Sequence, residues 1–428
     1  MVTLQMPWLA LPRLLSTLLF IATVGTAVAR DNPTTLPATP ALRQLIGETL
    51  EQNPGVQAAR AAVEAAEARA RGADRPLYNP ELELDAEQAE TRTATLGLNQ
   101  AIDWADKRSV RTEVAGAERD AARAEYAAVR QQLTGELLAA LGRYHTAADI
   151  QRLTQQRLEL MQRFLDLAEQ RRRAGDVNQV ELDLARLAHA QAALQSSQSA
   201  ADLAEAQQAL AAITGEPRTD WPVLPAELPA IEDVDVDTLL TNLPVLRAQQ
   251  ARVVAARATV TLRNRERRPD PILGVRAGQE RGFRNGNDDA YGVAGLTLNI
   301  PLYVRNSFRA EVEAAGAELT QADQSLQDGH RRARAQLLSA ADRYRLSRSA
   351  WEAWLRTGQA SLGSQVALLE RIWRAGEMST ADYLVQLNQT LETRATALEA
   401  QGRLWTAWAD WLVASGQADA WLGQSDAR

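Results

Sequence analysis

Arg173-Ala174-Gly175-Asp176 and Arg374-Ala375-Gly376-Glu377 are two copies of one short pattern, nearly half of the chain apart. Each glycine is expected to end a helix, because glycine readily adopts the left-handed conformation of a helix C-cap. Solenoid repeats are about 20–50 residues long, so this longer spacing predicts one duplicated domain. Other segments repeat at nearly the same spacing: Ser109–Val114 with Ser307–Val312, Ala115–Glu118 with Ala315–Glu318, and Arg143-Tyr144 with Arg343-Tyr344.

The duplicated unit reads as a helix, a β-hairpin and a long helical hairpin, a fold that is mainly α with a small β part. In the first copy, residues 30–215, we expect the β-hairpin at about 80–102 and the helical hairpin at about 104–213. Residues 81–87 alternate acidic and apolar side chains, which is the period of a strand. The first arm of the helical hairpin lacks proline. About 70 helical residues at about 1.5 Å each would extend about 100 Å.

The second copy, residues 238–416, has the same order of elements. Its β-hairpin is expected at about 271–301, with a loop of Gly, Arg, Asn and Asp residues at 280–289. Its helical hairpin is expected at about 306–414, beginning with one unbroken helix to about residue 375. The last helix carries a heptad stripe typical of coiled-coil packing: Leu384, Leu391, Leu398, Trp405 and Leu412.

Three segments lie outside the two copies. Residues 1–29 read as a secretory signal peptide, because a basic residue and an apolar run precede Ala27-Val28-Ala29. The apolar run is shorter than the about 20 residues that span a membrane, which disfavours a retained anchor. Residues 216–237 form a proline-rich linker between the copies, and residues 417–428 a C-terminal tail.

Composition excludes several classes of function. The chain has no cysteine, which removes disulfides, thiol catalysis, thiolate metal sites and lipid attachment through cysteine. Its net charge of −7 disfavours nucleic-acid binding. No pattern resembles a nucleophile with its base or a phosphate loop, and the three histidines are scattered among helical residues. We therefore expect no enzyme activity, no cofactor and no metal site of high affinity.

The strands and the long helices together constrain the assembly. Four strands cannot close a membrane barrel, because the smallest such barrels have eight, and lipid does not tolerate open sheet edges. Three copies would supply twelve strands and close an outer-membrane β-barrel. The helical hairpins of the same three copies would form an α-helical barrel in the periplasm. The sequence therefore indicates a conduit.

The chain resembles the TolC-type outer-membrane factors, the exit ducts of tripartite efflux pumps and of type I secretion. The resemblance rests on the order of several short motifs within the duplicated pattern: Asn53-Pro54, Asn79-Pro80, the two Arg-Ala-Gly turns, Ile300-Pro301-Leu302-Tyr303 with Arg305-Asn306, and Ser379-Thr380-Ala381-Asp382-Tyr383-Leu384. It implies a homotrimer in the outer membrane of a Gram-negative bacterium, in contact with lipid and with a large periplasmic portion. Its partners would be a periplasmic adaptor protein and an inner-membrane pump of the RND type.

Within the family, the segment from Ile300 to Asn306 is most similar to the branch associated with cobalt–zinc–cadmium efflux. This similarity implies a gated trimeric pore that exports divalent heavy-metal cations. A duct for drugs or for type I protein secretion is an alternative. A periplasmic coiled-coil adaptor or structural protein is a third possibility, but its single helical hairpin would leave both β-hairpins unexplained.

The two glycine turns are candidate docking tips. As local structure they are helix caps in hairpin turns. The resemblance implies that they also meet the hairpins of the adaptor protein at the periplasmic end of the duct. The candidate docking residues are Gly175, Asp176, Gly376, Glu377, Ser379 and Thr380.

Charged residues beside the tips are candidates for the pore and its gate. Asp382 and Glu181 occupy matching positions just after the two tips, with Asp183 nearby and Arg173 before the first tip. Acids at a helix N-terminus and cations at a C-terminus are favoured by the helix dipole alone. Under threefold symmetry the acids would also form carboxylate rings, which favour cations. Val385 occupies the place of a second acid found in some relatives, which weakens the case for a doubled ring.

Aromatic residues fall into two groups. The tryptophans of the long helices, such as Trp405 and Trp408, are expected to pack between helices. Residues next to the strands are expected at a membrane interface, where tryptophan and tyrosine are enriched: Tyr78, Trp104, Tyr291 and Tyr303.

Overall fold

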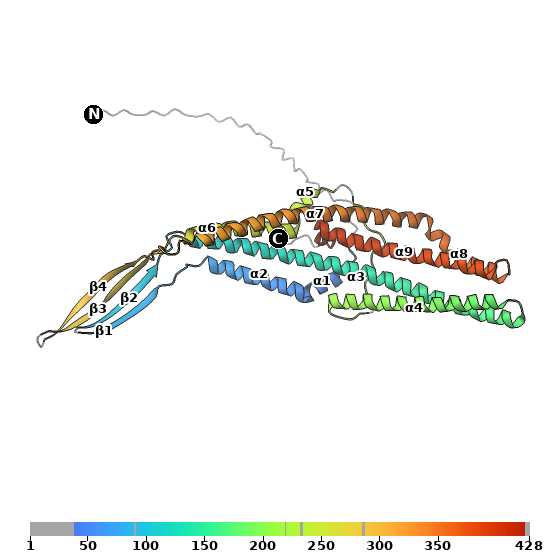
Figure 1. Ribbon diagram of the computed structural model, residues 1–428, viewed down its shortest axis with the longest axis horizontal. Coiled ribbons are helices and arrows are strands. Elements are labelled where there is room, and N and C mark those ends of the chain that lie inside the picture. Colours follow the sequence, from blue (N-terminus) through green and yellow to red (C-terminus); the bar gives the residue numbers. More distant parts are fainter. Residues whose placement is uncertain (1–37, 90, 219, 232–233, 285–286, 424–428) are drawn as a thin grey trace, which may run out of the picture. The chain divides into compact units, whose positions relative to one another are not determined.

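The computed structural model describes residues 38–89, 91–218, 220–231, 234–284 and 287–423. The expected signal peptide at 1–29 lies outside these residues. The described chain is mainly helical with one small antiparallel sheet (Figure 1), which confirms the predicted fold class. No described helix is both long enough and apolar enough to cross a membrane.

Among the described residues, the first copy contains four helices and two strands. Its expected N-terminal helix is divided at Asn53-Pro54, as this pair predicts. The Asn53 side chain accepts hydrogen bonds from the Gly55 and Val56 amides, and Pro54 opens the second helix. Proline suits a first helical position because its nitrogen has no hydrogen to leave unsatisfied. The elements are α1 (Pro40–Gln52), α2 (Pro54–Ala73), β1 (Glu81–Gln88), β2 (Thr91–Ala101), α3 (Lys107–Ala174) and α4 (Gln179–Thr214).

The second copy differs from our expectations at two places. The expected loop at 280–289 is wrong, because most of its residues continue the strands, and Glu280 pairs with Tyr291 in their ladder. The expected unbroken helix at 306–375 is wrong because the helix is interrupted at Gly358. The elements are α5 (Val236–Asn242), α6 (Pro244–Glu266), β3 (Ile272–Arg284), β4 (Asn287–Asn299), α7 (Arg309–Thr357), α8 (Gln359–Arg374), α9 (Thr380–Ser415) and α10 (Ala418–Trp421).

Gly358, where the helix is interrupted, lies against the ring of Trp354. A β-carbon at this position would lie 2.2 Å from Cε3 of Trp354, so the indole ring occupies the space that any other residue would need. The Gly358 amide still donates to the Trp354 carbonyl, and regular helix resumes at once in α8. Glycine is a common site of helix kinks. The glycine therefore leaves room for the Trp354 ring to pack against its own helix.

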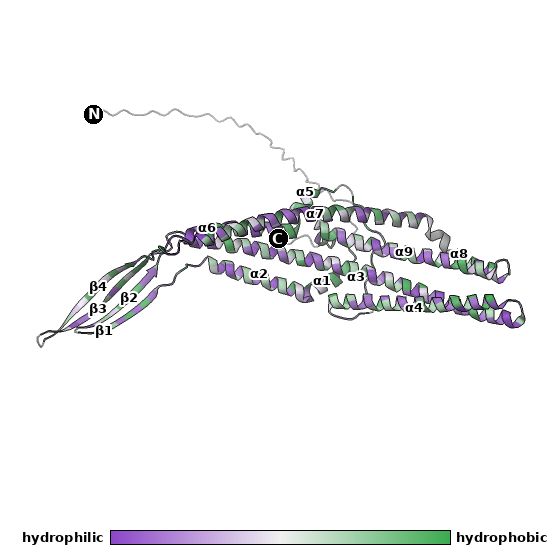
Figure 2. Ribbon diagram, in the orientation of Figure 1, coloured by the Kyte–Doolittle hydropathy of each residue, from purple (hydrophilic) through white to green (hydrophobic). Residues whose placement is uncertain are grey.

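The strands form one sheet in the order β1-β2-β3-β4, each antiparallel to its neighbour. The register places Leu82, Leu98, Val275 and Leu296 in one row across the sheet. Because side chains alternate between faces along a strand, all large apolar residues of β1 and β2 lie on one face. Figure 2 shows this alternation of hydrophilic and hydrophobic residues along the strands.

The helices pack through two hydrophobic clusters, and α3 contacts α2, α4, α6 and α9. One cluster joins α1, α3, α7 and α9, and Trp405 and Trp408 are buried in it as expected. The other joins α3, α4, α8 and α9. The segment expected as a linker also contributes to the first cluster through Trp221, and the expected tail contributes Trp421. Tryptophan burial therefore fixes both segments to the helices.

A buried ion pair joins the two copies next to the strands. Nζ of Lys107, at the start of α3, lies 2.9 Å from Oδ2 of Asp270, and both side chains are more than nine-tenths buried. Lys107 also donates to the Arg268 carbonyl at 2.7 Å, and the Tyr78 hydroxyl donates to Oδ2 of Asp270. Burial and this hydrogen bond raise the pKa of Tyr78 to about 12. Lys107 is the only lysine in the sequence.

Removal of one member of this pair is predicted to destabilise the chain. Asp270→Asn leaves the Lys107 ammonium buried without its counter-charge and should lower the free energy of unfolding by about 3–5 kcal/mol. Urea denaturation followed by helical circular dichroism measures this change. The triple variant Tyr78→Phe/Lys107→Met/Asp270→Leu removes charges and hydroxyl together and should lose less. A single variant as stable as the unmodified chain would show that the pair contributes nothing.

Candidate functional site

The sheet exposes an apolar face. The side chains of Leu84 and Leu296 are 78% and 85% exposed, and the other large apolar residues of this face are about half exposed or more. An exposed apolar surface of this kind marks an interaction site in a native protein. The face is formed by Leu82, Leu84, Ala86, Ala94, Leu96, Leu98, Leu273, Val275, Ala277, Ala294, Leu296 and Leu298.

The opposite face of the sheet is polar and acidic. Strand β1 places four acids on it at alternate positions: Glu81, Glu83, Asp85 and Glu87. Asn99 of β2 donates to Oε2 of Glu83 at 2.8 Å. Arg276 of β3 lies on the same face, opposite Gly97 and Gly295. The sheet thus separates an apolar surface from one suited to water and cations.

The two tips have the same backbone geometry. Gly175 and Gly376 have φ angles of 90° and 79°, in the left-handed region. After each glycine the next amide bonds back to a helical carbonyl, from Asp176 to Arg171 at 2.9 Å and from Glu377 to Ile372 at 3.1 Å. This is the Schellman arrangement, which satisfies helix-end carbonyls. The tips are exposed, as docking would require.

The helices after the tips also begin alike. The Asn178 side chain accepts from the Glu181 amide at 2.9 Å, and Oγ of Ser379 accepts from the Asp382 amide at 3.1 Å. The Ser379 hydroxyl also donates to the Asp382 carboxylate at 2.6 Å. Both acids therefore sit in the first turn of a helix, where the helix dipole favours them. The duplication extends to the caps themselves.

The predicted gate residues do not form one cluster in the chain. Arg173 lies 3.8 Å from Glu169 on its own helix, and Arg186 lies within ion-pair distance of both Glu169 and Asp183. Asp382 has its hydrogen bonds with Ser379, and no described arginine forms an ion pair with it. Any ring of acids must therefore come from several copies of the chain.

An aromatic cluster behind the tips was missed by sequence reasoning. The rings of Trp373 and Tyr383 stack with centroids 5.0 Å apart, and Phe164 lies 4.8 Å from Trp373. The Arg171 guanidinium lies 5.2 Å above the Trp373 ring. Burial raises the pKa of Tyr383 to about 12. Phe164 and Arg171 belong to the first hairpin and the other rings to the second, so the cluster joins the two tips.

Thr380, an expected docking residue, accepts a hydrogen bond from the Trp373 indole at 3.4 Å.

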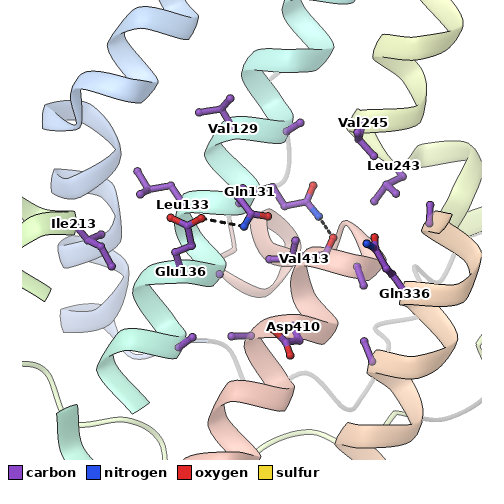
Figure 3. A pocket seen from close by; sticks show the side chains of 18 of the residues that line it. Val129, Gln131, Leu133, Glu136, Ile213, Leu243, Val245, Gln336, Asp410 and Val413 are labelled. Atoms are coloured by element: carbon purple, nitrogen blue, oxygen red, sulfur yellow. Dashed lines mark hydrogen bonds between the residues drawn. The ribbon is translucent and has the colours of Figure 1, made fainter. Parts of the chain in front are cut away.

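A cavity with a volume of about 930 Å³ lies between helices α3, α7 and α9 and the start of α6 (Figure 3). Its wall is mostly apolar, as at Val129 and Leu133. Gln131 points across to α9, where its amide donates to the Val413 carbonyl. Asp410 on the same wall pairs with Arg343 at 3.4 Å. Among the described residues, no group of three histidines or acids could hold a metal ion.

The residues expected at a membrane interface fall in different environments. Trp104 is 61% exposed, as an interface residue would be. Tyr78 instead turns to Asp270 in the buried ion-pair network. Tyr291 lies on the polar face of the sheet, opposite Glu280, and is 62% exposed. Aromatic residues that lie close to a strand in the sequence can therefore have different surroundings in the fold.

The glycine requirement at the second tip is testable. Gly376→Ala forces a β-carbon into the left-handed region and should destabilise the chain by about 1 kcal/mol. Gly316→Ala is the matched control, because Gly316 lies inside α7 with open space around its Cα. There alanine should stabilise by about 0.5–1 kcal/mol. Thermal unfolding of both variants measures the difference, and equal effects would contradict the strained-turn account.

Comparison with known proteins agrees with this architecture. The sequence profile described as "Outer membrane efflux protein" matches residues 45–216 and 236–417. The cobalt-zinc-cadmium resistance protein CzcC of Cupriavidus metallidurans is 28% identical over 238 residues. That alignment covers 54% of this chain and 56% of CzcC.

Solved structures share the fold at low identity. The CmeC outer membrane channel of Campylobacter jejuni matches with a TM-score of 0.74 and 17% identity, over 98% of this chain and 95% of CmeC. The open MtrE outer membrane channel of Neisseria gonorrhoeae matches with a TM-score of 0.71 and 17% identity, over 89% and 90%. The chain belongs to the outer membrane efflux protein family, the TolC-type outer-membrane factors.

Proposed function

We propose that three copies of this chain form an outer-membrane channel, the exit duct of a tripartite efflux system with an adaptor protein and an RND-type pump. The observation that carries the proposal is the two-faced sheet. Its exposed leucines suit lipid, and its opposite face, with Glu81 to Glu87, suits a water-filled lumen. Outer-membrane barrels alternate in this way along each strand.

The edges of the sheet support three copies. Within the described chain, β1 pairs only with β2, and β4 only with β3. Their outer hydrogen-bonding groups need partners, because a lipid-exposed sheet edge is not tolerated. Pairing β4 of one copy with β1 of the next gives twelve strands from three copies. The long helices α3, α4, α7, α8 and α9 would continue this barrel as a helical barrel in the periplasm.

Divalent heavy-metal cations are the proposed cargo. The sequence similarity to CzcC, whose name refers to cobalt, zinc and cadmium, supports this substrate class. Each of the three copies would contribute the acids of its β1 strand to the lumen, and carboxylate-lined pores favour cations. The duct needs no metal site of high affinity, since a pump upstream would select the ion. The exposed tips at Gly175 and Gly376 are the proposed docking surface for the adaptor.

The structure bears differently on the two alternatives, a duct for another cargo and a periplasmic adaptor. A duct for drugs or for type I secretion would need the same sheet and the same tips, so the fold alone does not separate it from a metal duct. A periplasmic coiled-coil adaptor would have no use for an apolar sheet face. The sheet therefore favours a channel, and substrate tests must identify the cargo.

Survival assays test both the channel and its cargo. A strain lacking the chain should become sensitive to zinc, cobalt or cadmium but not to hydrophobic drugs, and the unmodified gene should restore resistance. Complementation by Leu296→Arg should fail, because arginine near the bilayer midplane costs about 2–4 kcal/mol. Thr297→Arg, one residue away on the polar face, is the matched control and should succeed. Sensitivity to drugs alone would discard the metal assignment.

Conductance tests the proposed gate. Asp382 and Glu181 would form rings at the tips, and Asp382→Ala should leave the trimer intact while lowering preference for cations. The loss of one helix-dipole contact costs at most about 1 kcal/mol, so assembly should survive. Single-channel currents in planar bilayers measure the change, with Glu51→Ala on α1 as a control acid. Unchanged currents and selectivity for Asp382→Ala would exclude the acidic ring.

A further inference from the structure

The exposed apolar stripe on β4 continues beyond the end of the strand. Leu296 and Leu298 are followed at alternate positions by Ile300, Leu302 and Val304. The last two are 77% and 86% exposed. Strand β4 ends at Asn299, and a bend follows at Val304 and Arg305. The exposed apolar residues therefore continue past the strand to Val304, directly before Arg305.

Arginines without carboxylate partners gather where this stripe ends. We define the arginine band as Arg75, Arg268, Arg305 and Arg309, which are all exposed. None of the four forms an ion pair with a described carboxylate. Arg75 follows α2 and Arg268 follows α6, while Arg305 and Arg309 lie just before and at the start of α7. The four arginines therefore come from three separate segments of the chain.

Contacts on the neighbouring residues hold these segments together. The ammonium of Lys107 donates to the Arg268 carbonyl at 2.7 Å. Nε of Arg267 donates to the Ser307 carbonyl at 3.2 Å, which links the end of α6 to the segment before α7. Arg108 at the start of α3 lies 3.4 Å from Asp74, next to Arg75. The arginine band is therefore fixed around the base of the sheet.

Two nearby acids, Asp103 and Asp106, are already engaged within the chain. Asp106 binds Arg265 at 2.9 Å, and hydrogen bonds from Ser109 and Arg265 lower the pKa of Asp106. Asp103 accepts the backbone amides of Lys107 and Arg108, both at 2.8 Å. Glu311, the acid in the first turn of α7, is half-buried and makes no ion pair among the described residues. In a chain of net charge −7, the four exposed arginines stand out because they have no ion pair with a described carboxylate.

The long helices α3 and α7 both begin with basic residues. Helix α3 begins with Lys107 and Arg108 and has no acid in its first turn, and α7 begins with Arg309. The helix dipole disfavours cations at a helix N-terminus and attracts anions there. At α3 the chain itself supplies the anions, because Asp103 accepts the first backbone amides, Asp270 pairs with Lys107 and Asp74 pairs with Arg108. An external anion in this region would be favoured by the four arginines that have no ion pair with a described carboxylate.

We propose that the arginine band binds the phosphates of anionic phospholipids at the periplasmic surface of the outer membrane. The inference rests on the proposed channel, which places this region at the boundary of lipid and water. Guanidinium groups match phosphate oxygens in paired hydrogen bonds. The exposed Trp104, two residues after Ile102, suits the same depth, because tryptophan concentrates at membrane interfaces. Continuity with the apolar stripe favours a lipid over a soluble phosphate.

A lipid-quenching experiment tests the proposal. Because the chain has no cysteine, Leu302→Cys gives one labelling site for bimane beside the arginine band. The purified full chain in mixed micelles is titrated with brominated phosphatidylglycerol or brominated phosphatidylcholine. Half-quenching should need at least about fivefold less of the anionic lipid, since arginines near an anionic surface each strengthen binding about fivefold. Equal quenching by the two lipids would overturn the proposal.

Variants separate a specific site from general charge. Arg268→Gln/Arg305→Gln/Arg309→Gln should abolish the lipid preference, and it removes no ion pair between described residues. Arg356→Gln/Arg371→Gln/Arg394→Gln removes three exposed arginines elsewhere and should keep it. Equal loss in both triple variants would contradict the proposal, as would displacement of the lipid by excess soluble glycerol phosphate.

Measurements on the same preparation distinguish a failure of the lipid site from a failure of the proposed channel. Trimer mass and single-channel conductance in phosphatidylcholine bilayers report on the channel without anionic lipid. A conducting trimer without lipid preference would overturn the arginine band alone. A chain that neither trimerises nor conducts would overturn the proposed channel and the lipid site that rests on it.

Discussion

A sheet with one exposed apolar face and two unpaired edges cannot be the final state of this chain in water. The backbone groups along the outer sides of β1 and β4 need hydrogen-bond partners, and the leucines of the apolar face need removal from water. Lipid and further copies of the chain meet both needs at once. The proposed trimer and its place in the membrane follow from this constraint.

The buried pair of Lys107 and Asp270 connects the sheet to the helices. It joins the beginning of α3 in the first copy to Asp270, two residues before β3, in the second, so both copies must be folded for it to form. Apart from the three histidines, every other basic side chain in the sequence is arginine. An ammonium is a compact charge with three donors, whereas a guanidinium is a larger planar group with five donors, so arginine would not reproduce the contacts of Lys107 in this buried site. We regard this contact as the point where the duplicated halves become one unit.

The sequence predicted those features that local patterns determine. Period-two alternation identified the strands around Leu84, and the glycines of the two tips identified the helix ends. The buried pair and the cluster of Phe164 and Trp373 depend on contacts between distant segments, which no local period reveals. Gly358 was read as an ordinary helical residue because its role depends on how the Trp354 ring packs. The duplicated tips were foreseeable, but the way in which Thr380 bonds to Trp373 was not.

The absence of cysteine makes the central claim directly measurable. Leu296→Cys and Thr297→Cys place one label on each face of β4, on the full chain reconstituted in phospholipid vesicles. The account predicts that a lipid-dissolved quencher reaches the label at 296 and that a water-soluble quencher reaches the label at 297. Equal access of the water-soluble quencher to both positions would contradict a sheet that separates lipid from an aqueous lumen.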